Sequence, residues 1–229
     1  MIMIRTIITV LFILSISFTK AQEVLQIKYS DGAPHLNMLN ESYLFISDEL
    51  SEFYHPLESK KIVTPQGFEA EISRNYYSVF ISDESHTVIK TLEDGTLLYA
   101  TYEPEPLVWQ LTDETKEILG YPCQKAILSK ESAKKYGADP QMGDVIAWFT
   151  PEIETQLGPK LYAGLPGLIL EITYTEWTGH RAVATEIKKV EREVRLPNYL
   201  GFRVSEKDIW SNNWSRREIK KLREGSKDY

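Results

Sequence analysis

Two stretches of the chain have the pattern of β-hairpins, and this pattern constrains the fold more than any other sequence feature. In Thr87–Tyr102, Asp94-Gly95 separates two runs of extended-type residues. A two-residue turn of the primed type needs positive φ at its centre, which this dipeptide tolerates. The expected register pairs Leu92 with Leu97 and Ile89 with Ala100. Both faces then carry apolar side chains, as in strands that are covered on two sides.

The second hairpin is expected in Leu168–Val190, with its turn at Thr178-Gly179. Its expected register pairs Leu170 with Ile187, Ile172 with Thr185, Tyr174 with Val183 and Glu176 with Arg181. One face of the pair then forms a continuous apolar stripe. Cross-strand pairs contribute roughly 0.2 to 1 kcal/mol each, so together they are expected to set the register.

Six further runs are rich in branched or aromatic residues and bounded by turn formers, which predicts strands. They are Val24–Tyr29, Tyr43–Ile46, Tyr76–Ile81, Val108–Leu111, Cys123–Leu128 and Val145–Thr150. Glu131–Asp144 is expected to be a surface excursion between two strands. The pattern therefore predicts a mainly β fold of about ten strands, arranged as an antiparallel curved sheet or an open half-barrel.

Ser205–Gly225 is predicted to form a C-terminal α-helix packed against the sheet. Ser205 can cap the helix, basic side chains suit its last turn, and Gly225 suits its end. Trp210 and Trp214 lie one turn apart and are expected to hold the helix on the sheet. A helix that detaches as a lid is the alternative.

The charge balance and the cysteine content exclude several classes of protein. With 26 basic against 33 acidic residues, the net charge of -7 argues against general nucleic-acid binding. One cysteine in 229 residues excludes an internal disulfide and any multi-cysteine metal site. Residues 22–180 hold 11 bases and 25 acids, whereas residues 181–229 hold 13 bases and 8 acids. We expect these parts to attract each other; docking of the basic segment on anionic lipid or a partner is the alternative. We find no internal repeat.

Residues 1–21 are interpreted as a secretory signal peptide. Arg5 precedes an apolar stretch from Ile7 to Phe18, and the segment ends at small Ala21. A membrane anchor is the alternative, but the stretch is shorter than the roughly 20 residues that span a bilayer. We therefore expect an exported protein, periplasmic or in the outer envelope, with one domain over residues 22–229 and no membrane span after cleavage.

The middle of the chain resembles a known family. From Trp109 it reads WQLTDETKEILGYPCQKAILSK, and from Val145 it reads VIAWFTPEIETQLGPKLYAGLPGLILEI. The hexapeptide Gly164-Leu165-Pro166-Gly167-Leu168-Ile169, together with the Ala147–Thr150 and Thr115–Lys125 runs, is similar to the GLPGLI family of exported Bacteroidetes proteins. The family usually has proline where this chain has Glu154, which puts only the local turn in doubt. The resemblance implies export and carries no established activity.

The hexapeptide is expected to have a structural role. Leu165-Pro166-Gly167-Leu168 fits a type II turn, with proline setting φ and glycine taking positive φ. Gly164 would allow close approach of the backbone to a neighbour. The turn would then start the strand at Leu168. A ligand-contacting loop is the alternative, although the hexapeptide contains no titratable group.

No set of residues in the sequence has the pattern of a known catalytic site. The histidines, His35, His55, His86 and His180, lie in separate segments and are interpreted as surface or turn residues, so we expect no metal and no cofactor. Cys123 is expected to be a buried thiol. Glu152 and Glu154, two apart, are expected to lie on a solvated edge rather than to form an acid and base pair. Enzyme activity is disfavoured.

Aromatic residues suggest where a ligand could bind. The candidate cavity residues are Trp109, Tyr121, Trp148, Tyr162, Tyr174, Trp210 and Trp214. Our leading hypothesis is non-catalytic binding of an apolar or amphipathic ligand, or of a partner peptide, in the concave face of the sheet. The alternative is an envelope adaptor that acts through its surface around a filled core. A hydrolase that uses Glu152, Glu154 or His55 is the third hypothesis.

Overall fold

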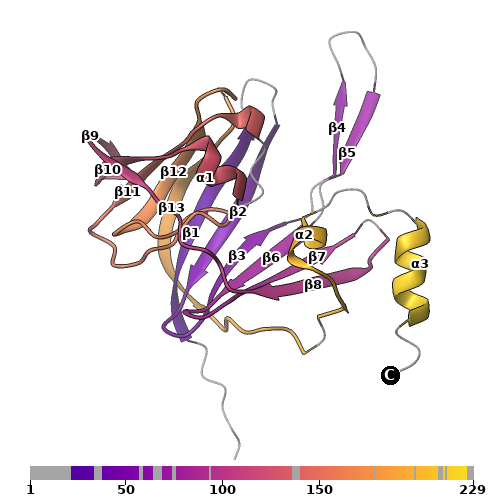
Figure 1. Ribbon diagram of the computed structural model, residues 1–229. Helices are drawn as coiled ribbons and strands as arrows, with labels where there is room; N and C mark the ends of the chain where they lie inside the picture. The colour runs from indigo at the N-terminus through magenta and orange to yellow at the C-terminus, as the bar shows by residue number, and fades with distance from the viewer. Residues whose placement is uncertain are drawn as a thin grey trace, which may run out of the picture.

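A computed structural model of the chain describes residues 22–33, 38–56, 59–63, 69–73, 76–92, 94–135, 140–177, 179–198, 200–210, 214 and 216–225. The protein is mainly β, and twelve strands form one sheet (Figure 1). The expected signal peptide lies outside the described residues and stays a prediction.

The large sheet is antiparallel throughout, except where its short edge strand β14 runs parallel to β8. In spatial order it holds β14 (Phe202–Arg203), β8 (Leu97–Tyr102), β7 (His86–Thr91), β6 (Tyr76–Ile81), β3 (Ser51–His55), β2 (Met38–Ile46), β1 (Gln22–Ala33), β13 (Arg181–Arg192), β12 (Leu168–Tyr174), β11 (Val145–Thr150), β10 (Tyr121–Leu128) and β9 (Gln110–Ile118). Strands β4 (Ser59–Val63) and β5 (Glu69–Ser73) form a separate pair. Since β14 and β9 do not meet, the sheet is open, as expected.

All ten expected strands have a counterpart in this sheet, although the strand expected at Val108–Leu111 lies further along the chain, at Gln110–Ile118, and two more strands complete the sheet. The additional strands are β3 and β14. Strand β14 has only two residues, too few to show a periodic pattern, and β3 has the sequence Ser-Glu-Phe-Tyr-His, which combines polar and aromatic residues.

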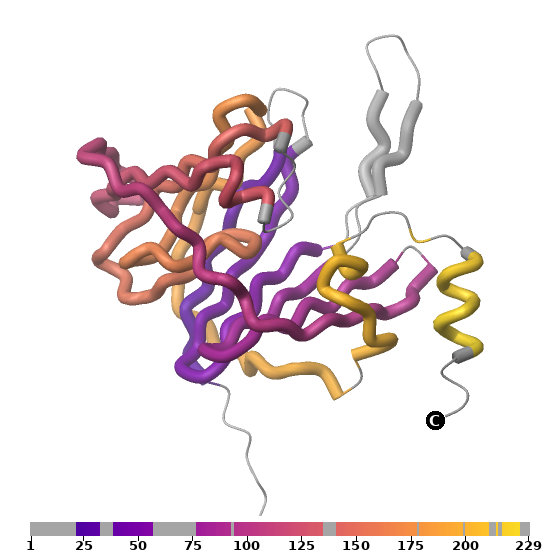
Figure 2. Tube along the Cα trace, in the orientation of Figure 1, coloured from indigo at the N-terminus to yellow at the C-terminus, as the bar shows by residue number. Residues whose placement is uncertain are grey.

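Strand β1 joins the two halves of the sheet. It pairs with β2 on one side and with β13 on the other, from Gln22 opposite Arg192 to Gly32 opposite Arg181. In Figure 1, β9–β13 lie on one side of the long strands β1 and β2, and β3 and β6–β8 lie on the other. The segment after β8 crosses from one half to the other (Figure 2).

The first predicted hairpin forms, but its register is shifted by one residue. Thr91 pairs with Leu97, and Val88 pairs with Ala100. The turn is longer than expected because the amide of Leu92 donates to the Thr96 carbonyl, while the amide of Gly95 donates to the Leu92 carbonyl. Gly95 takes a φ of 79°. This is a three-residue loop with glycine at the left-handed position, and it explains the shift.

The second predicted hairpin is shifted by three residues. Glu171 pairs with Val183, and Thr173 pairs with Arg181. Strand β12 ends at Tyr174 because the next two amides, those of Thr175 and Glu176, donate to carbonyls of Asp144 and Met142. The chain just beyond β12 thus bonds to the excursion between β10 and β11, a contact that the sequence of the hairpin alone does not show.

The expected C-terminal helix is two helices. Helix α2 (Glu206–Ile209) starts where the Ser205 side chain accepts a hydrogen bond from the amide of Asp208, as expected for a cap. Trp210 ends α2, and a separate helix α3 (Arg216–Gly225) ends at the predicted residue. The excursion between β10 and β11 contains helix α1 (Lys130–Lys135) and a single 3-10 turn, Pro140–Met142.

Two clusters of buried apolar side chains hold the sheet and its coverings together. The larger cluster joins both halves of the sheet with α2 and α3; its members include Ile27, Phe53, Leu98, Leu168 and Ile209. The smaller cluster lies over β10–β12 and α1; its members include Leu128, Ala133, Phe149 and Ile172. Strand β12 contributes to both, since Leu168, Ile169, Leu170 and Ile172 are all fully buried. Burial on both faces agrees with its nearly continuous apolar sequence.

Candidate functional site

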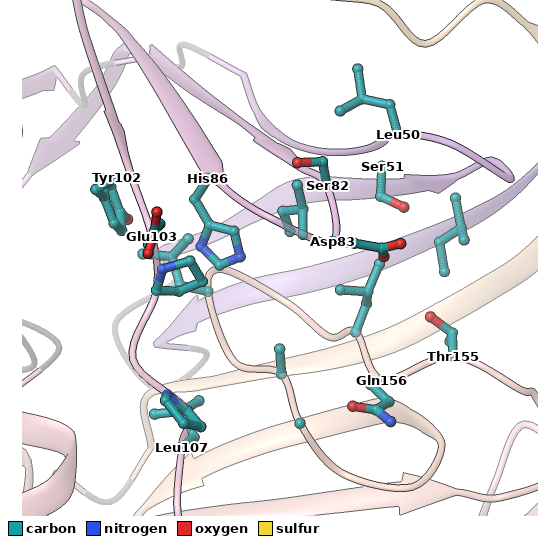
Figure 3. Close-up of a pocket in the computed structure, with 18 of the residues that line it drawn as sticks. Leu50, Ser51, Ser82, Asp83, His86, Tyr102, Glu103, Leu107, Thr155 and Gln156 are labelled. Carbon is teal, nitrogen blue, oxygen red and sulfur yellow. The ribbon is translucent and has the colours of Figure 1, made fainter.

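A groove of about 1140 Å³ opens where five segments of the chain meet. It is lined by the β2–β3 turn, the β6–β7 turn, the segment Tyr102–Leu107 after β8, the loop Glu154–Gly164 before β12, and α2. Figure 3 shows Asp83, His86, Glu103 and Gln156 around this space. We refer to it as the groove, and to Glu154–Gly164 as the groove wall.

The two turns at the groove share a sequence and a structure. Ile46-Ser47-Asp48-Glu49 and Ile81-Ser82-Asp83-Glu84 repeat the same four residue types. In each turn the first serine Oγ donates to the carbonyl of the residue three positions on, Leu50 or Ser85, and accepts from its amide. Because β3 pairs with β6 from Ser51 opposite Ile81, both turns lie at the same end of the sheet. This short repeat, which was not among the features expected from the sequence, marks the rim of the groove.

Acidic side chains dominate the groove. Seven carboxylates line it: Asp48, Glu49, Asp83, Glu103, Glu105, Glu154 and Glu206. Among the described lining residues there is no lysine or arginine. Elsewhere in the described part of the chain, no lysine or arginine forms an ion pair with Glu49, Asp83, Glu103, Glu154 or Glu206. The groove therefore carries concentrated negative charge, and the described lysine and arginine side chains do not pair with these five carboxylates.

Apolar and aromatic side chains form the rest of the lining. They include Ile46, Leu50, Ile81, Tyr102, Leu107, Leu157, Leu161 and Trp210. Burial raises the pKa of Tyr102 to about 12, and burial lowers the pKa of His86 below its ordinary 6.5. Tyr102 and His86 are therefore both neutral at pH 7, and the acidic character comes from the carboxylates.

Helix α2 is built into the protein at this site. Ile209 is fully buried in the larger cluster, and the buried Lys90 amine on β7 donates to the Ile209 carbonyl over 3.4 Å. A cation at the C-terminal end of a helix stabilises its exposed carbonyls. Trp210 and Glu206 are thus held at the groove by a packed helix, and the lid that we gave as an alternative is not favoured for α2.

A second group of ionisable side chains is buried outside the groove. Asp31 on β1 is 3% exposed, and His55 on β3 is 5% exposed. The Lys160 Nζ lies 3.3 Å from Asp31 Oδ1, His180 Nε2 lies 3.8 Å from the same oxygen, and His55 Nδ1 lies 4.0 Å from Oδ2. Our interpretation of the histidines as surface or turn residues was wrong for His55 and His86, because both lie on strands inside the sheet and are buried there. His35 lies outside the described residues.

The seven aromatic candidates do not converge on one cavity. Trp210 lines the groove. Trp109, Tyr162 and Tyr174 lie at the smaller cluster, where Trp109 Nε1 donates to the Ala163 carbonyl and the Tyr162 and Tyr174 hydroxyls are 3.4 Å apart. The remaining three, Tyr121, Trp148 and Trp214, pack against the larger cluster. Ligand binding by these residues stays a prediction.

The hexapeptide leads into strand β12 as expected, but its turn differs from type II. The Gly167 amide donates to the Leu165 carbonyl, so the turn closes one residue earlier, around Pro166. Gly167, at a φ of 153°, also makes the close approach that we expected at Gly164: a Cβ there would lie 2.1 Å from the Thr150 carbonyl oxygen. Gly164 instead takes a φ of 86°, in the left-handed region that glycine adopts more readily than other residues.

Cys123, Glu152 and Glu154 lie in or next to strands β10 and β11. Cys123 is a buried free thiol, as predicted. Glu152 and Glu154 are exposed, but they lie in the loop after β11 rather than on a strand, and Glu154 lines the groove.

Within the described residues, no three histidine, cysteine or acidic side chains are grouped so that they could hold a metal ion. No described helix has the length and apolar character needed to cross a membrane.

Comparison with known proteins matches part of the chain to a family of unknown function and finds solved structures with a similar fold. Residues 129–171 match the family described as "Protein of unknown function (Porph_ging)". No curated protein matches the sequence. The chain is similar in structure to PNGF-II, with a TM-score of 0.58, 15% identity and coverage of 88% of this chain in the P21 crystal form. In the C2 form the TM-score is 0.53 at 14% identity, again over 88% of this chain.

The structural likeness covers a limited part of PNGF-II. This chain spans 34% of the PNGF-II chain in the first crystal form and 32% in the second. At this level of identity the likeness concerns the fold alone.

Proposed function

We propose that this protein is an exported, non-catalytic binding protein of the GLPGLI family, whose groove holds a segment of a partner protein that carries both cationic and apolar side chains. The observation that carries the proposal is the lining of the groove. Seven carboxylates surround apolar and aromatic side chains, and no described lysine or arginine lies among them.

The charge of the groove favours a cationic ligand. Carboxylates that share one groove repel each other, and a ligand with lysine or arginine side chains relieves this repulsion. The apolar lining, which includes Leu157, Leu161 and Trp210, favours a ligand that also buries apolar surface. An extended peptide alternates its side chains between two faces and can therefore meet both requirements.

The volume and rigidity of the groove agree with this assignment. A volume of about 1140 Å³ is just above the roughly 300 to 1,000 Å³ that is typical of small-molecule pockets, so the groove has room for a short run of residues. Hydrogen-bonded turns, a capped helix and paired strands hold its lining in place. A preformed groove loses less conformational entropy on binding than a flexible one.

Export and family membership are supported by the sequence. The pattern of residues 1–21 supports a signal peptide, and the hexapeptide at Gly164–Ile169 supports the GLPGLI family. The match of residues 129–171 to a family of unknown function is consistent with this assignment. The place of action would then be the periplasm or the outer envelope.

A titration with labelled peptides tests the binding proposal. We expect the protein, purified after export, to bind a ten-residue alternating Lys-Leu peptide, and to bind Glu-Leu and Ser-Leu peptides of equal length at least about tenfold more weakly. Fluorescence anisotropy of the peptide at 50 and 300 mM salt measures the affinity. The Lys-Leu affinity is expected to fall as salt is added.

Matched variants separate the groove from the net charge of the protein. The triple variant Asp48→Asn, Asp83→Asn, Glu103→Gln removes three charges from the groove. The control Glu117→Gln, Glu191→Gln, Glu193→Gln removes three exposed carboxylates outside the groove. We expect about a tenfold loss of affinity in the first variant and less than about twofold in the second. Equal losses, or equal binding of all three peptides, would contradict the proposal.

A further inference from the structure

Two adjacent residues of the groove wall, Lys160 and Leu161, point to different parts of the protein. Leu161 lines the groove, whereas Lys160 reaches the carboxylate of Asp31 on β1, with its Nζ 3.3 Å from Oδ1. Leu157, on the other side of Lys160, also lines the groove. The side chain that ties this loop to the central strand therefore lies between two residues that shape the binding surface.

The backbone at this point is strained. Lys160 has a φ of 62°, in the left-handed region that side chains other than glycine rarely adopt. Such a conformation persists only where the surrounding structure holds it. The Tyr162 amide closes a turn across Lys160 by donating to the Pro159 carbonyl, and the Lys160 side chain contacts the Asp31 carboxylate and the ring of Tyr174, whose centroid is 5.7 Å from Nζ.

A cationic partner stabilises the ionised Asp31 carboxylate more than it would stabilise an exposed one, because Asp31 is buried. Its side chain is only 4% exposed, and a buried carboxylate is strongly disfavoured unless it is paired. The two histidines that approach it, His55 and His180, belong to β3 and to the loop before β13. The carboxylate thus joins β1 to three separate parts of the chain.

We infer that Asp31 and Lys160 are positioning residues, which hold the groove wall against the sheet and so keep the groove in its binding shape. This inference rests on the proposed function, because it assigns the pair a role in binding. Neither residue lines the groove, so the pair would act through Leu157 and Leu161.

The titration of Lys160 provides a signature of this role. Burial lowers its pKa, but the charges that face it outweigh burial, and the net pKa is raised above 10.5. The groups that face it are Asp31 on β1, Tyr77 on β6, Tyr162 in the same loop, Tyr174 on β12, and, across Asp31, His55 and His180. The pair is therefore intact below pH 10.5 and is lost as the pH rises through the raised pKa of Lys160.

Hydrogen exchange of the peptide-free protein at pH 7 tests whether the pair holds the wall. The reporter is the Gly164 amide, which donates to the Gln156 carbonyl within the wall. We expect at least tenfold faster exchange at Gly164 in Lys160→Met, and about the wild-type rate in Lys160→Arg. The control Lys116→Met removes another half-buried lysine that pairs with a carboxylate, Glu171, and should leave Gly164 unchanged. An unchanged Gly164 rate in Lys160→Met would overturn the inference.

A second variant covers the case in which Lys160→Met does not fold. Asp31→Asn combined with Lys160→Met leaves no unpaired buried charge, and it is expected to give the same faster exchange at Gly164. Wild-type exchange in the folded double variant would also overturn the inference.

Peptide binding then separates this inference from the proposed function. An alternating Arg-Leu peptide keeps its charge at high pH. Its affinity for the wild type should fall at least tenfold once the pH, raised in steps from 9.5, has passed the raised pKa of Lys160, and the fall over the same range should be at most threefold in Lys160→Arg. If the wild type binds no cationic peptide at all, the proposed function fails, while the exchange rates still decide whether the pair anchors the wall. If wild type and Lys160→Arg lose affinity equally, the positioning role in binding is overturned.

Discussion

The hydroxyl of Tyr29 donates a hydrogen bond of 2.8 Å to the carbonyl oxygen of Ile169, which is 140 residues further along the chain. Tyr29 lies on β1, and Ile169 is the last residue of the hexapeptide at the start of β12. Strand β13 lies between β1 and β12 in the sheet, so this bond joins strands that are not neighbours. Burial raises the pKa of the Tyr29 hydroxyl far above its ordinary value, which keeps it a donor at all moderate pH values.

Removing this hydroxyl should destabilise the fold measurably. We expect Tyr29→Phe to lower the free energy of unfolding by about 1 kcal/mol, because the bond lies in the fully buried interior. Urea denaturation at several pH values between 5 and 9 measures the loss, which should not vary with pH. Tyr43→Phe is the control, since the Tyr43 hydroxyl donates to an exposed carboxylate, that of Glu41. Equal losses in the two variants would contradict this assignment.

A Cβ at Gly167 should be tolerated much less well than a Cβ at Gly120. A Cβ at Gly167 would lie 2.1 Å from the Thr150 carbonyl oxygen, whereas at Gly120 it would meet no atom within 4 Å. Both residues have positive φ, so Gly120→Ala measures backbone strain alone, about 1 to 2 kcal/mol. We expect Gly167→Ala to lose on the order of 3 to 4 kcal/mol by thermal or urea unfolding. A loss no larger than that of Gly120→Ala would show that β11 and β12 can separate at this point without penalty.

His86 should make the protein less stable in mild acid. Burial lowers its pKa in the folded state below the 6.5 of the unfolded chain. Below pH 6.5 the unfolded chain therefore binds a proton that the folded chain does not, and stability falls as the pH drops through 6.5 toward the folded pKa. This contribution is at most about 1.4 kcal/mol per pH unit.

Comparison of His86→Gln with the wild type isolates this contribution. Urea unfolding between pH 7.5 and 5 should show a flatter stability profile for the variant than for the wild type. Parallel profiles would mean that His86 accepts a proton in the folded state as readily as in the unfolded state.

The single thiol should report on unfolding. Cys123 is 2% exposed, and burial raises the pKa of its thiol from 9.0 to about 11. The thiolate is the reactive form, and at pH 8 the rise of the pKa from 9.0 to about 11 lowers the thiolate fraction about 100-fold relative to the unfolded chain, so labelling by a disulfide reagent should be slower in the native protein. Absorbance of the released thiol in buffer and in 6 M guanidinium measures the ratio, with Cys123→Ser as the unlabelled control. Comparable rates in both solutions would show that the thiol is accessible in the native protein.

The sequence predicted the class of fold and most of its strands because these depend on local properties. Branched and aromatic residues alternate with turn formers such as Asp94-Gly95, and this pattern marks strands wherever they pair. The cap at Ser205 and the end of the helical region at Gly225 were also predicted from the sequence, since helix ends depend on neighbouring residues. The break between α2 and α3 was not predicted, because the uninterrupted polar and apolar pattern there suits one helix.

Part of the groove could have been recognised from the sequence. The tetrapeptide Ile-Ser-Asp-Glu at Ile46 and again at Ile81 marks two equivalent turns with adjacent acids. These two turns meet at one end of the sheet because β3 pairs with β6. The local sequence pattern does not predict that these two strands pair. The approach of the Glu154–Gly164 loop and of α2 depends on long-range contacts in the same way.

By itself, the sequence determined that this chain forms an antiparallel, open, strand-rich fold with a helical C-terminal region, and that Cys123 is buried. These properties follow from side-chain periodicity and turn chemistry, which act over a few residues. Only the tertiary structure decided both hairpin registers, the acidic groove, and the approach of His55 and Lys160 to the buried Asp31. Each of these depends on which strands pair and on which polar groups contact each other across the fold. A short stretch of sequence does not determine either.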